Sequence, residues 1–135
     1  MSKIQVVGAI IIKNHKLLAA QRASNRVLGG YWEFPGGKIE PSETPEHAMA
    51  RELKEEFGAQ ATVFEKFSID GIAELKFGEV ILHCYYVRLD SDITKTIAHD
   101  ELRWVTPQEA LKLSWAPSDV AVIEALAKTG FKYEY

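Results

Sequence analysis

The stretch GKIEPSETPEHAMARELKEEFGA, residues 37–59, decides the fold of this chain. Its second half predicts a helix over residues 44–57. Thr44 can cap the helix, and Pro45 fits the first helical position, where an N–H group is not needed. Gly58 can adopt the left-handed conformation that ends a helix. Both ends of the helix are therefore marked in the sequence.

Two faces of this helix carry different chemistry. Each residue turns an α-helix by roughly 100°, so Glu52, Glu55 and Glu56 share one arc of roughly 100°. A separate arc carries the apolar side chains of Met49, Leu53 and Phe57. We expect the apolar arc to dock on a sheet while the acids face a cleft.

The clustered carboxylates predict a metal site. Like charges destabilise a bare helix by roughly 0.2–0.5 kcal/mol per close pair, and a hard divalent cation reverses that effect. Mg²⁺ prefers oxygen ligands and commonly shares its shell with phosphates, so these acids favour Mg²⁺ or Mn²⁺ over zinc. Taken alone, the acids also fit a solvated glutamate-rich helix paired with Arg51 and Lys54.

Apolar segments on both sides of the helix predict strands. They cover residues 5–12, 17–21, 32–34, 62–69, 79–88 and 102–105. The polar residues 13–16 predict a hairpin turn, and Pro35-Gly36-Gly37 is expected to break the strand at 32–34.

Two shorter helices are expected near the end of the chain, over residues 107–113 and 118–128. The inner face of the last helix is predicted as Val120, Ile123, Leu126 and Ala127. Strands and helices mix without strict alternation, which favours an α/β layered domain with a mixed sheet over a doubly wound parallel one.

The bulk composition narrows the function. A chain of 135 residues suits one domain over 1–135, and a formal net charge of −3 argues against a partner that is a nucleic-acid polymer. Cys84 is the single cysteine, so no internal disulfide can form. No apolar run approaches the roughly 20 residues of a membrane span, and no signal peptide is evident. We expect a cytoplasmic monomer or homodimer.

The stretch from Gly37 to Ala59 resembles the Nudix signature. That signature reads Gly, five residues, Glu, seven residues, Arg-Glu, an aliphatic, any residue, Glu-Glu, any residue, Gly and an aliphatic or small residue. Every fixed position is present, and Ala59 is a weak match because a larger aliphatic residue is usual there. LLAAQR, WEFPGGK and HDELRWVTPQEAL outside this stretch look like the MutT-type branch of the family.

The resemblance implies both fold and activity. The implied fold is an α/β/α sandwich with a central mixed sheet. The implied reaction is Mg²⁺-dependent hydrolysis of a (deoxy)nucleoside triphosphate to the monophosphate and pyrophosphate. The nucleotide substrate is expected to be oxidised or modified, as in 8-oxo-dGTP, or CTP-like.

The resemblance also implies residue roles around the metal. Glu52, Glu55 and Glu56 look like metal-binding acids, with the Gly36 carbonyl as a further ligand. Glu52 is the first choice for general base, Glu55 shares the catalytic centre, and Glu101 completes the metal site or helps to activate water. Structural support is expected from Gly37, Glu43 and Arg51, because an Arg–carboxylate fork would pin the loop to the helix and orient Glu52.

Five further residues are candidates for substrate binding: Arg22, Phe34, Lys38, His83 and Asp119. Lys38 could hold a terminal phosphate, and Phe34 could stack on a base. Asp119 either reads the base edge or caps the last helix. His83 is either a pocket residue or a histidine with structural hydrogen bonds.

Two other functions stay open at this stage. One is hydrolysis of ADP-ribose or another nucleoside diphosphate derivative, although the proline often found past the signature in such enzymes is missing between Pro45 and Pro107. The other is a non-catalytic nucleotide-binding module, although inert members usually lose the signature acids that this chain keeps.

Overall fold

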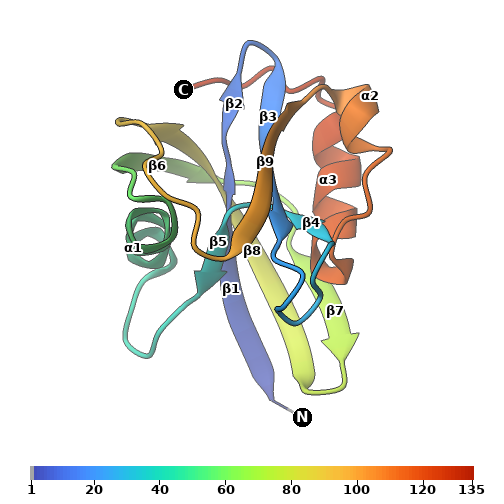
Figure 1. The fold of residues 1–135 in the computed structure, drawn as a ribbon. Coiled ribbons are helices and arrows are strands. Elements are labelled where there is room, and N and C mark those ends of the chain that lie inside the picture. Colours follow the sequence, from blue (N-terminus) through green and yellow to red (C-terminus); the bar gives the residue numbers. More distant parts are fainter. Residues whose placement is uncertain (1) are drawn as a thin grey trace.

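The chain opens with a strand and a hairpin. Strand β1 (Lys3–Ile10) leads into β2 (Ile12–Lys13), which pairs with β3 (Lys16–Arg22) (Figure 1). Asn14 and His15 between them have φ angles of 54° and 60°. Positive φ at both central residues gives a turn whose twist matches the flanking strands, so the predicted hairpin is confirmed.

Helix α1 (Pro45–Phe57) begins and ends where the sequence predicts in this computed structural model, which describes residues 2–135. The Thr44 hydroxyl accepts from the His47 N–H at 3.1 Å, and Gly58 ends the helix with a φ of 62°. Ala48, Met49, Leu53 and Phe57 are at most 1% exposed. Fully burying a leucine or phenylalanine contributes roughly 1.5–3 kcal/mol, so this face fixes the helix on the sheet.

The central sheet is mixed. It contains β1, β5 (Gly36–Lys38), β6 (Ala61–Lys66), β7 (Gly71–Leu75) and β8 (Gly78–Leu89). Strands β1 and β8 run parallel at its centre, and β5 pairs antiparallel with the outer edge of β1. Strands β6 and β7 both pair antiparallel with the far edge of β8.

The break expected at Pro35-Gly36-Gly37 is confirmed, because the preceding strand ends at Glu33, but both glycines then belong to β5. A Cβ on Gly36 would lie 1.9 Å from the carbonyl oxygen of Val7. Glycine thus permits a closer approach of the two backbones than any other residue could. The glycines mark close packing of β5 on β1 as well as the end of β4 (Trp32–Glu33).

The strand expected over residues 62–69 is shorter than predicted, and β7 was not predicted at all. Strand β6 ends at Lys66, and β7 begins at Gly71. Strand β8 has 12 residues, which is long enough to pair with both. The pairing partner that makes 71–75 a strand is therefore distant in sequence, and local composition carried no sign of it.

The remaining strands form a second, antiparallel sheet. Strand β9 (His99–Val105) pairs with one edge of β3, and β2 and β4 pair with the other edge. Helix α2 (Pro107–Ala110) has a capping box between Thr106 and Glu109 and is shorter than the predicted 107–113.

The last predicted helix is divided into the 3-10 turn η1 (Pro117–Asp119) and helix α3 (Val120–Ala127). Ile123 and Leu126 are buried as predicted, together with Val122. Val120 is 40% exposed, so its placement on the inner face is wrong. The tighter 3-10 turn before it changes the phase of the helix relative to a continuous α-helix.

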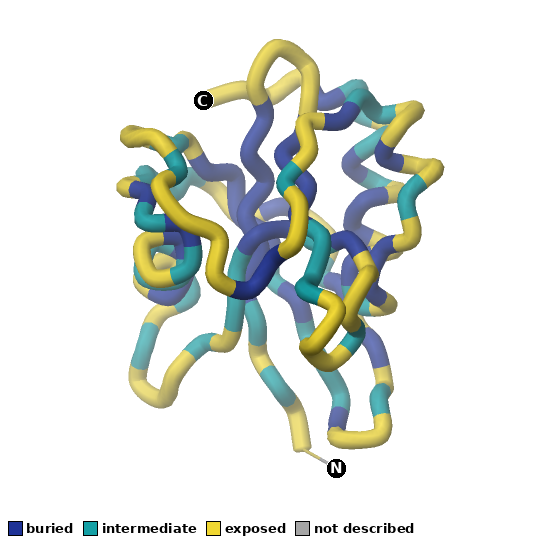
Figure 2. Tube along the Cα trace, in the orientation of Figure 1, coloured by how far each residue is buried: buried dark blue, intermediate teal, exposed yellow. Residues whose placement is uncertain are grey.

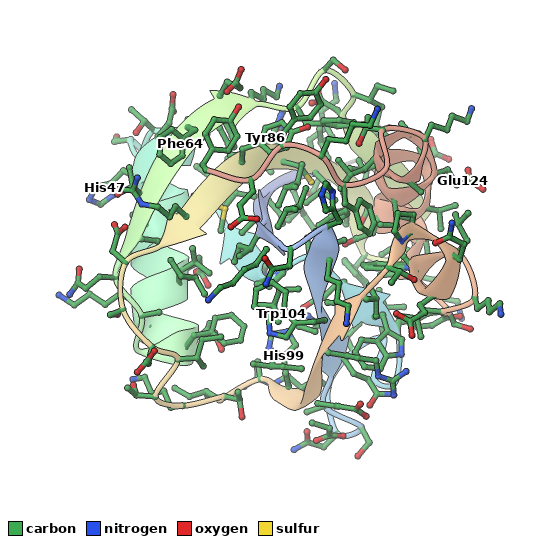
Figure 3. The ribbon with its side chains drawn as sticks, turned by 90° about the horizontal axis from the view of Figure 1, so that it is seen from above. His47, Phe64, Tyr86, His99, Trp104 and Glu124 are labelled. Atoms are coloured by element: carbon green, nitrogen blue, oxygen red, sulfur yellow. The ribbon has the colours of Figure 1, made fainter. Side chains whose placement is uncertain are left out.

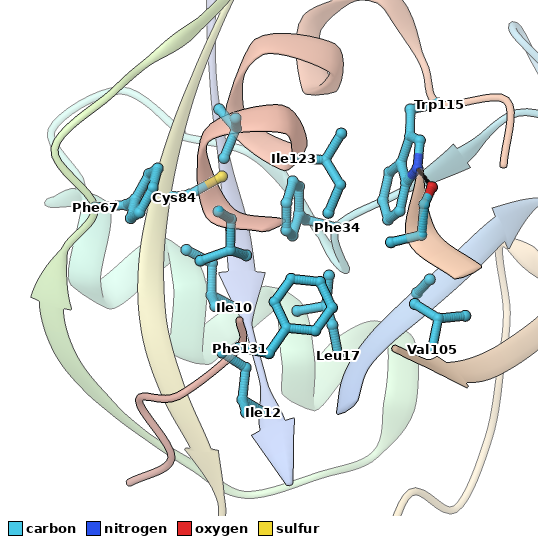
Figure 4. Close-up of a cluster of buried hydrophobic side chains, with 14 of the residues drawn as sticks. Ile10, Ile12, Leu17, Phe34, Phe67, Cys84, Val105, Trp115, Ile123 and Phe131 are labelled. Carbon is cyan, nitrogen blue, oxygen red and sulfur yellow. Dashed lines mark hydrogen bonds between the residues drawn. The ribbon is translucent and has the colours of Figure 1, made fainter. Parts of the chain in front are cut away.

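Helices α1 and α3 cover opposite sides of the central strands (Figure 1). Alternate residues of β1 serve the two layers, because side chains of a strand point to opposite faces. Val7 and Ala9 pack with the buried face of α1, whereas Ile10 packs with the apolar face of α3 (Figure 4). Figure 2 shows the central strands buried between the two helices. The expected α/β/α sandwich is confirmed.

Candidate active site

Arg51 and Glu43 form the two-pronged clamp that the sequence predicts. The Arg51 Nε donates to Glu43 Oε2 at 2.6 Å, and Nη2 donates to Oε1 at 2.8 Å. The same Nη2 donates to the Lys38 carbonyl at 3.0 Å. The guanidinium lowers the pKa of Glu43 to about 2. The clamp thus holds the loop after β5 against α1 with a charged pair of fixed geometry.

Arg51 also contacts two of the helix acids. Its Nη1 donates at 2.9 Å to an oxygen of Glu52 and at 2.9 Å to an oxygen of Glu55. The Glu52 side chain is 13% exposed and that of Glu55 is 53% exposed. Burial raises the pKa of Glu52 above its ordinary value despite the nearby guanidinium. The two acids therefore differ in environment although they share one cation.

Gly37 and Glu52 touch directly. A Cβ at position 37 would lie 2.3 Å from a Glu52 carboxylate oxygen. The absence of a side chain at Gly37 lets this carboxylate rest against the backbone of β5. Gly37 supports the site through this close approach, which any larger residue would block.

Glu56 has a buried oxygen without a partner. Its Oε2 is shielded from solvent and forms no hydrogen bond with any group in residues 2–135. A buried carboxylate oxygen left in this way is costly unless something else binds it. Across the same residues, no three His, Cys, Asp or Glu side chains gather closely enough to hold a metal ion. The donors present, carboxylate oxygens beside an orphaned one, suit a hard divalent cation.

The Gly36 carbonyl points toward the free edge of β5. The Ala9 N–H donates to the Pro35 carbonyl at 2.7 Å, so position 35 faces β1. Hydrogen-bonding groups alternate along an antiparallel strand, so the carbonyls of Gly36 and Lys38 face away from β1. The bond from Arg51 to the Lys38 carbonyl agrees with this direction. Gly36 therefore offers a backbone oxygen on the side where Arg51 lies.

A cavity of about 470 Å³ lies on the other side of β5 from this clamp. Its lining includes six residues that the sequence analysis singled out: Arg22, Phe34, Gly36, Gly37, Lys38 and Asp119. Because Gly37 also contacts the Glu52 carboxylate, one short strand borders both the cavity and the helix acids. A larger cavity of about 750 Å³, beside Arg88, Asp90 and Trp104, contains none of the predicted site residues.

Asp119 is the buried acid of the cavity of about 470 Å³. It is 4% exposed and accepts from the Phe34 N–H at 3.0 Å and from the Ser118 hydroxyl at 2.9 Å. Burial, followed by the negative charge of Glu33, raises the pKa of Asp119 to about 7. Near neutral pH this carboxyl can therefore either accept or donate a hydrogen bond. It does not cap α3 with its side chain.

Sequence reasoning missed Glu33 and its hydrogen-bond partner His99. Glu33 lines the cavity, and its carboxylate lies 3.3 Å from the Arg22 guanidinium and 2.8 Å from His99 Nε2. A charged residue between Trp32 and Phe34, both aromatic, was a usable signal for Glu33. His99 carried no comparable signal, because its contacts come from strands distant in sequence.

Phe34 has a different role from the one expected. Its side chain is 3% exposed and packs against Trp115, with ring centroids 5.4 Å apart. A ring this buried forms the wall of the cavity rather than a free stacking surface. Phe77 is 53% exposed and also lines the cavity, and it was missed together with the β7–β8 hairpin that carries it.

Two expected site residues lie apart from the cavity. His83 pairs with Val7 in the register of β8 and β1, on the α1 side of the sheet, where its ring contacts Gln5 at 2.6 Å and Asp70 at 3.4 Å. We therefore leave His83 out of the pocket. Glu101 on β9 accepts two hydrogen bonds from Arg103, and among residues 2–135 no hydrogen bond joins it to the acids of α1.

The comparisons with known proteins agree with this geometry. The NUDIX domain model matches residues 3–126 of the chain. The chain belongs to the Nudix family. The sequence and the fold both describe a Nudix hydrolase, and the predicted class, a hydrolase of diphosphate bonds, is confirmed. Nudix hydrolases use divalent metal ions.

This Nudix hydrolase is similar to two enzymes of Escherichia coli and to a solved structure of MutT. The CTP pyrophosphohydrolase of Escherichia coli K12 is 39% identical over 125 residues, covering 93% of this chain and 92% of that protein. The 8-oxo-dGTP diphosphatase of the same organism is 44% identical over 68 residues, covering 50% and 53%. The crystal structure of MutT from Methanosarcina mazei has a TM-score of 0.81 at 25% identity, covering 97% and 96%. In residues 2–135, no helix is both long and apolar enough to cross a membrane.

Proposed function

We propose that this Nudix hydrolase is a magnesium-dependent pyrophosphohydrolase that cleaves (deoxy)nucleoside triphosphates to the monophosphate and pyrophosphate. One observation carries the proposal: β5 separates the acids of α1 from a cavity that contains the buried Asp119. A nucleotide with its base in the cavity extends its phosphates past Lys38 toward the helix. We take residues 1–135 as one catalytic domain.

The cation ligands are proposed from the chemistry of their donors, although the acidic side chains of residues 2–135 do not converge on one point. Glu52, Glu55 and Glu56 supply carboxylates and Gly36 supplies its carbonyl, with Mg²⁺ as the native ion and Mn²⁺ as a substitute. Glu101 joins them if its bond to Arg103 is exchanged for the metal. When bound, the cation neutralises phosphate charge and lowers the pKa of a water.

The residues of the chain position the reaction. Glu52 is proposed as the general base, because its partly buried carboxylate lies against the backbone of β5 at Gly37. Arg51 orients Glu52, and Glu43 fixes Arg51 through the clamp. As the water oxygen bonds to phosphorus and the bridging bond between the α and β phosphates breaks, the Glu52 carboxylate receives the proton of that water, and the monophosphate and pyrophosphate separate.

The base of the substrate is proposed to contact Asp119. A carboxyl with a pKa of about 7 can meet either a donor or an acceptor on a base edge. This property suits a cytosine-like base and an oxidised guanine, whose edges differ in donors and acceptors. Relatives named CTP pyrophosphohydrolase and 8-oxo-dGTP diphosphatase support the same substrate classes.

Turnover of a substrate panel tests the proposal. CTP, dCTP, dGTP, 8-oxo-dGTP and ADP-ribose are incubated with Mg²⁺, and pyrophosphate, orthophosphate and monophosphates are quantified. We expect pyrophosphate and a monophosphate in equal amounts from at least one triphosphate. Release of AMP from ADP-ribose without action on triphosphates would contradict the proposal, and so would tight nucleotide binding without turnover.

A further inference from the structure

His99 lies buried between the catalytic helix and the nucleotide cavity. It is the first residue of β9 (Figure 3), and its side chain is 2% exposed. Its ring stacks on Phe57 of α1, with centroids 5.3 Å apart and an angle of 15° between the planes. Its Nε2 lies 2.8 Å from a carboxylate oxygen of Glu33. One ring therefore touches both α1 and the strand that lines the cavity.

The hydrogen bonds of His99 are incomplete. A carboxylate only accepts, so Nε2 carries the hydrogen and donates to Glu33. The other ring nitrogen, Nδ1, is buried and has no partner in residues 2–135. An unsatisfied buried nitrogen costs stability, and an apolar ring of similar shape would avoid that cost. Stability of the fold alone therefore does not explain a histidine at this position.

The contacts of Glu33 give a better explanation for a histidine at position 99. Glu33 lines the cavity, and its carboxylate also contacts the Arg22 guanidinium at 3.3 Å. Arg22 Nε donates to the Val27 carbonyl at 2.7 Å, so this cation is held from its other side by the loop after β3. His99 does not line the cavity, so it contacts the Glu33 carboxylate from outside the cavity lining.

We propose that His99 is a positioning residue that fixes Glu33, and through it Arg22, at the wall of the nucleotide cavity. The inference rests on the proposed function, because it concerns how the nucleotide is held before the phosphates reach α1. A fixed carboxylate and guanidinium present hydrogen-bonding groups to the ligand without further ordering on binding. The stacking of His99 on Phe57 also fixes the position of this wall relative to helix α1.

The variant His99→Phe tests the proposal most sharply, because it keeps the stacked ring and removes the donor. We expect its melting temperature to equal or exceed that of the wild type. We expect KM for the best triphosphate to rise about tenfold while kcat changes less than about twofold, since ground-state and transition-state binding weaken together. His99→Gln should restore most of the affinity, because its amide can donate to Glu33 from a similar position.

A matched control separates positioning from general stability. Val105→Ala removes buried volume from the same strand without touching Glu33. It should lower the melting temperature and leave KM unchanged. Wild-type KM in His99→Phe would overturn the proposal, and so would a fall in kcat alone or a failure of this variant to fold.

A second pair of variants tests the route through Glu33. Glu33→Gln should raise KM about as much as His99→Phe, and the double variant should be no worse than Glu33→Gln alone, because the two residues act through one contact. Additive losses would overturn the proposal. If the wild type hydrolyses no triphosphate, the proposed function fails. The dissociation constant of CMP, compared between wild type and His99→Phe, then still tests the positioning role.

Discussion

The functional side chains of α1 come from one continuous segment, whereas the cavity takes its lining from β1, β3, β4, β5, β7, β8 and η1. Their electrostatics differ as well. On α1, Arg51 bonds to Glu43, Glu52 and Glu55, and its guanidinium lowers the pKa of Glu43 to about 2. In the cavity, Asp119 is buried near another acid and its pKa rises to about 7. The comparison teaches that the proposed catalytic groups are charged and close in sequence, whereas the proposed base site takes its residues from distant segments and buries its acid.

The largest effect is expected from a substitution among the acids of α1. Glu56→Gln should lower kcat by roughly 10³-fold, because it weakens a charge that stabilises the transition state. The buried Oε2 has no hydrogen-bond partner among residues 2–135 to lose, so the melting temperature should not fall. Steady-state turnover with Mg²⁺ and a thermal melt measure both quantities. Glu124→Gln on α3 is the control of equal charge change, and a matching loss of kcat there would contradict the assignment.

The next largest effect is expected from a substitution in the cavity. Asp119→Asn should raise KM about tenfold for the preferred base with a smaller change in kcat, because the amide cannot reproduce both states of the acid. The pH dependence of KM between pH 6 and 8 should flatten, since the pKa of the wild-type carboxyl is about 7. A pH series of initial rates measures this. An unchanged pH profile would remove Asp119 from the substrate contacts.

The same substitution should also change how the stability of the protein depends on pH. The folded-state pKa of Asp119 is raised from 3.8 to about 7, so its contribution to stability is complete below pH 3.8 and is lost as the pH rises through 7. The asparagine has no charge to bury. Asp119→Asn should therefore be more stable than the wild type at pH 8, by about 1–3 kcal/mol, in denaturant titrations.

A smaller effect comes from the clamp. The pKa of Glu43 is lowered from 4.5 to about 2, so its contribution to stability is present above pH 4.5 and is lost as the pH falls through 2. Glu43→Gln should make the stability depend less on pH in this acid range. It should also reduce kcat by about threefold to tenfold, because Arg51 then orients Glu52 less well. Acid denaturation followed by circular dichroism measures the pH dependence of stability. Glu46→Gln, in the first turn of the same helix, should leave both unchanged.

The smallest effect concerns the rim of the cavity. Phe77→Ala should raise KM about threefold and change stability by less than about 0.5 kcal/mol, because the ring is 53% exposed. Ile97→Ala is the matched control, since Ile97 is 56% exposed and does not line the cavity. Equal KM values for the two variants would exclude Phe77 from substrate contact.

The same contrast explains what the sequence could predict. The cap at Thr44, the stop at Gly58 and the spacing of Arg51 from Glu43 are local patterns, and the structure contains each of them. Strand β7 and the neighbours of His99 depend on pairing with distant strands, which local patterns do not record. Phe34 was placed in the correct cavity with the wrong exposure, because burial follows from contacts such as that with Trp115.

Binding of Mn²⁺ to the free protein, followed by the electron paramagnetic resonance signal of unbound Mn²⁺, tests the central claim most directly. We expect the wild type and Glu124→Gln to bind the ion with equal affinity. Glu56→Gln should bind it at least about tenfold more weakly, since a charged oxygen ligand is lost. Equal Mn²⁺ affinity in all three proteins would contradict the claim that the acids of α1 hold the cation.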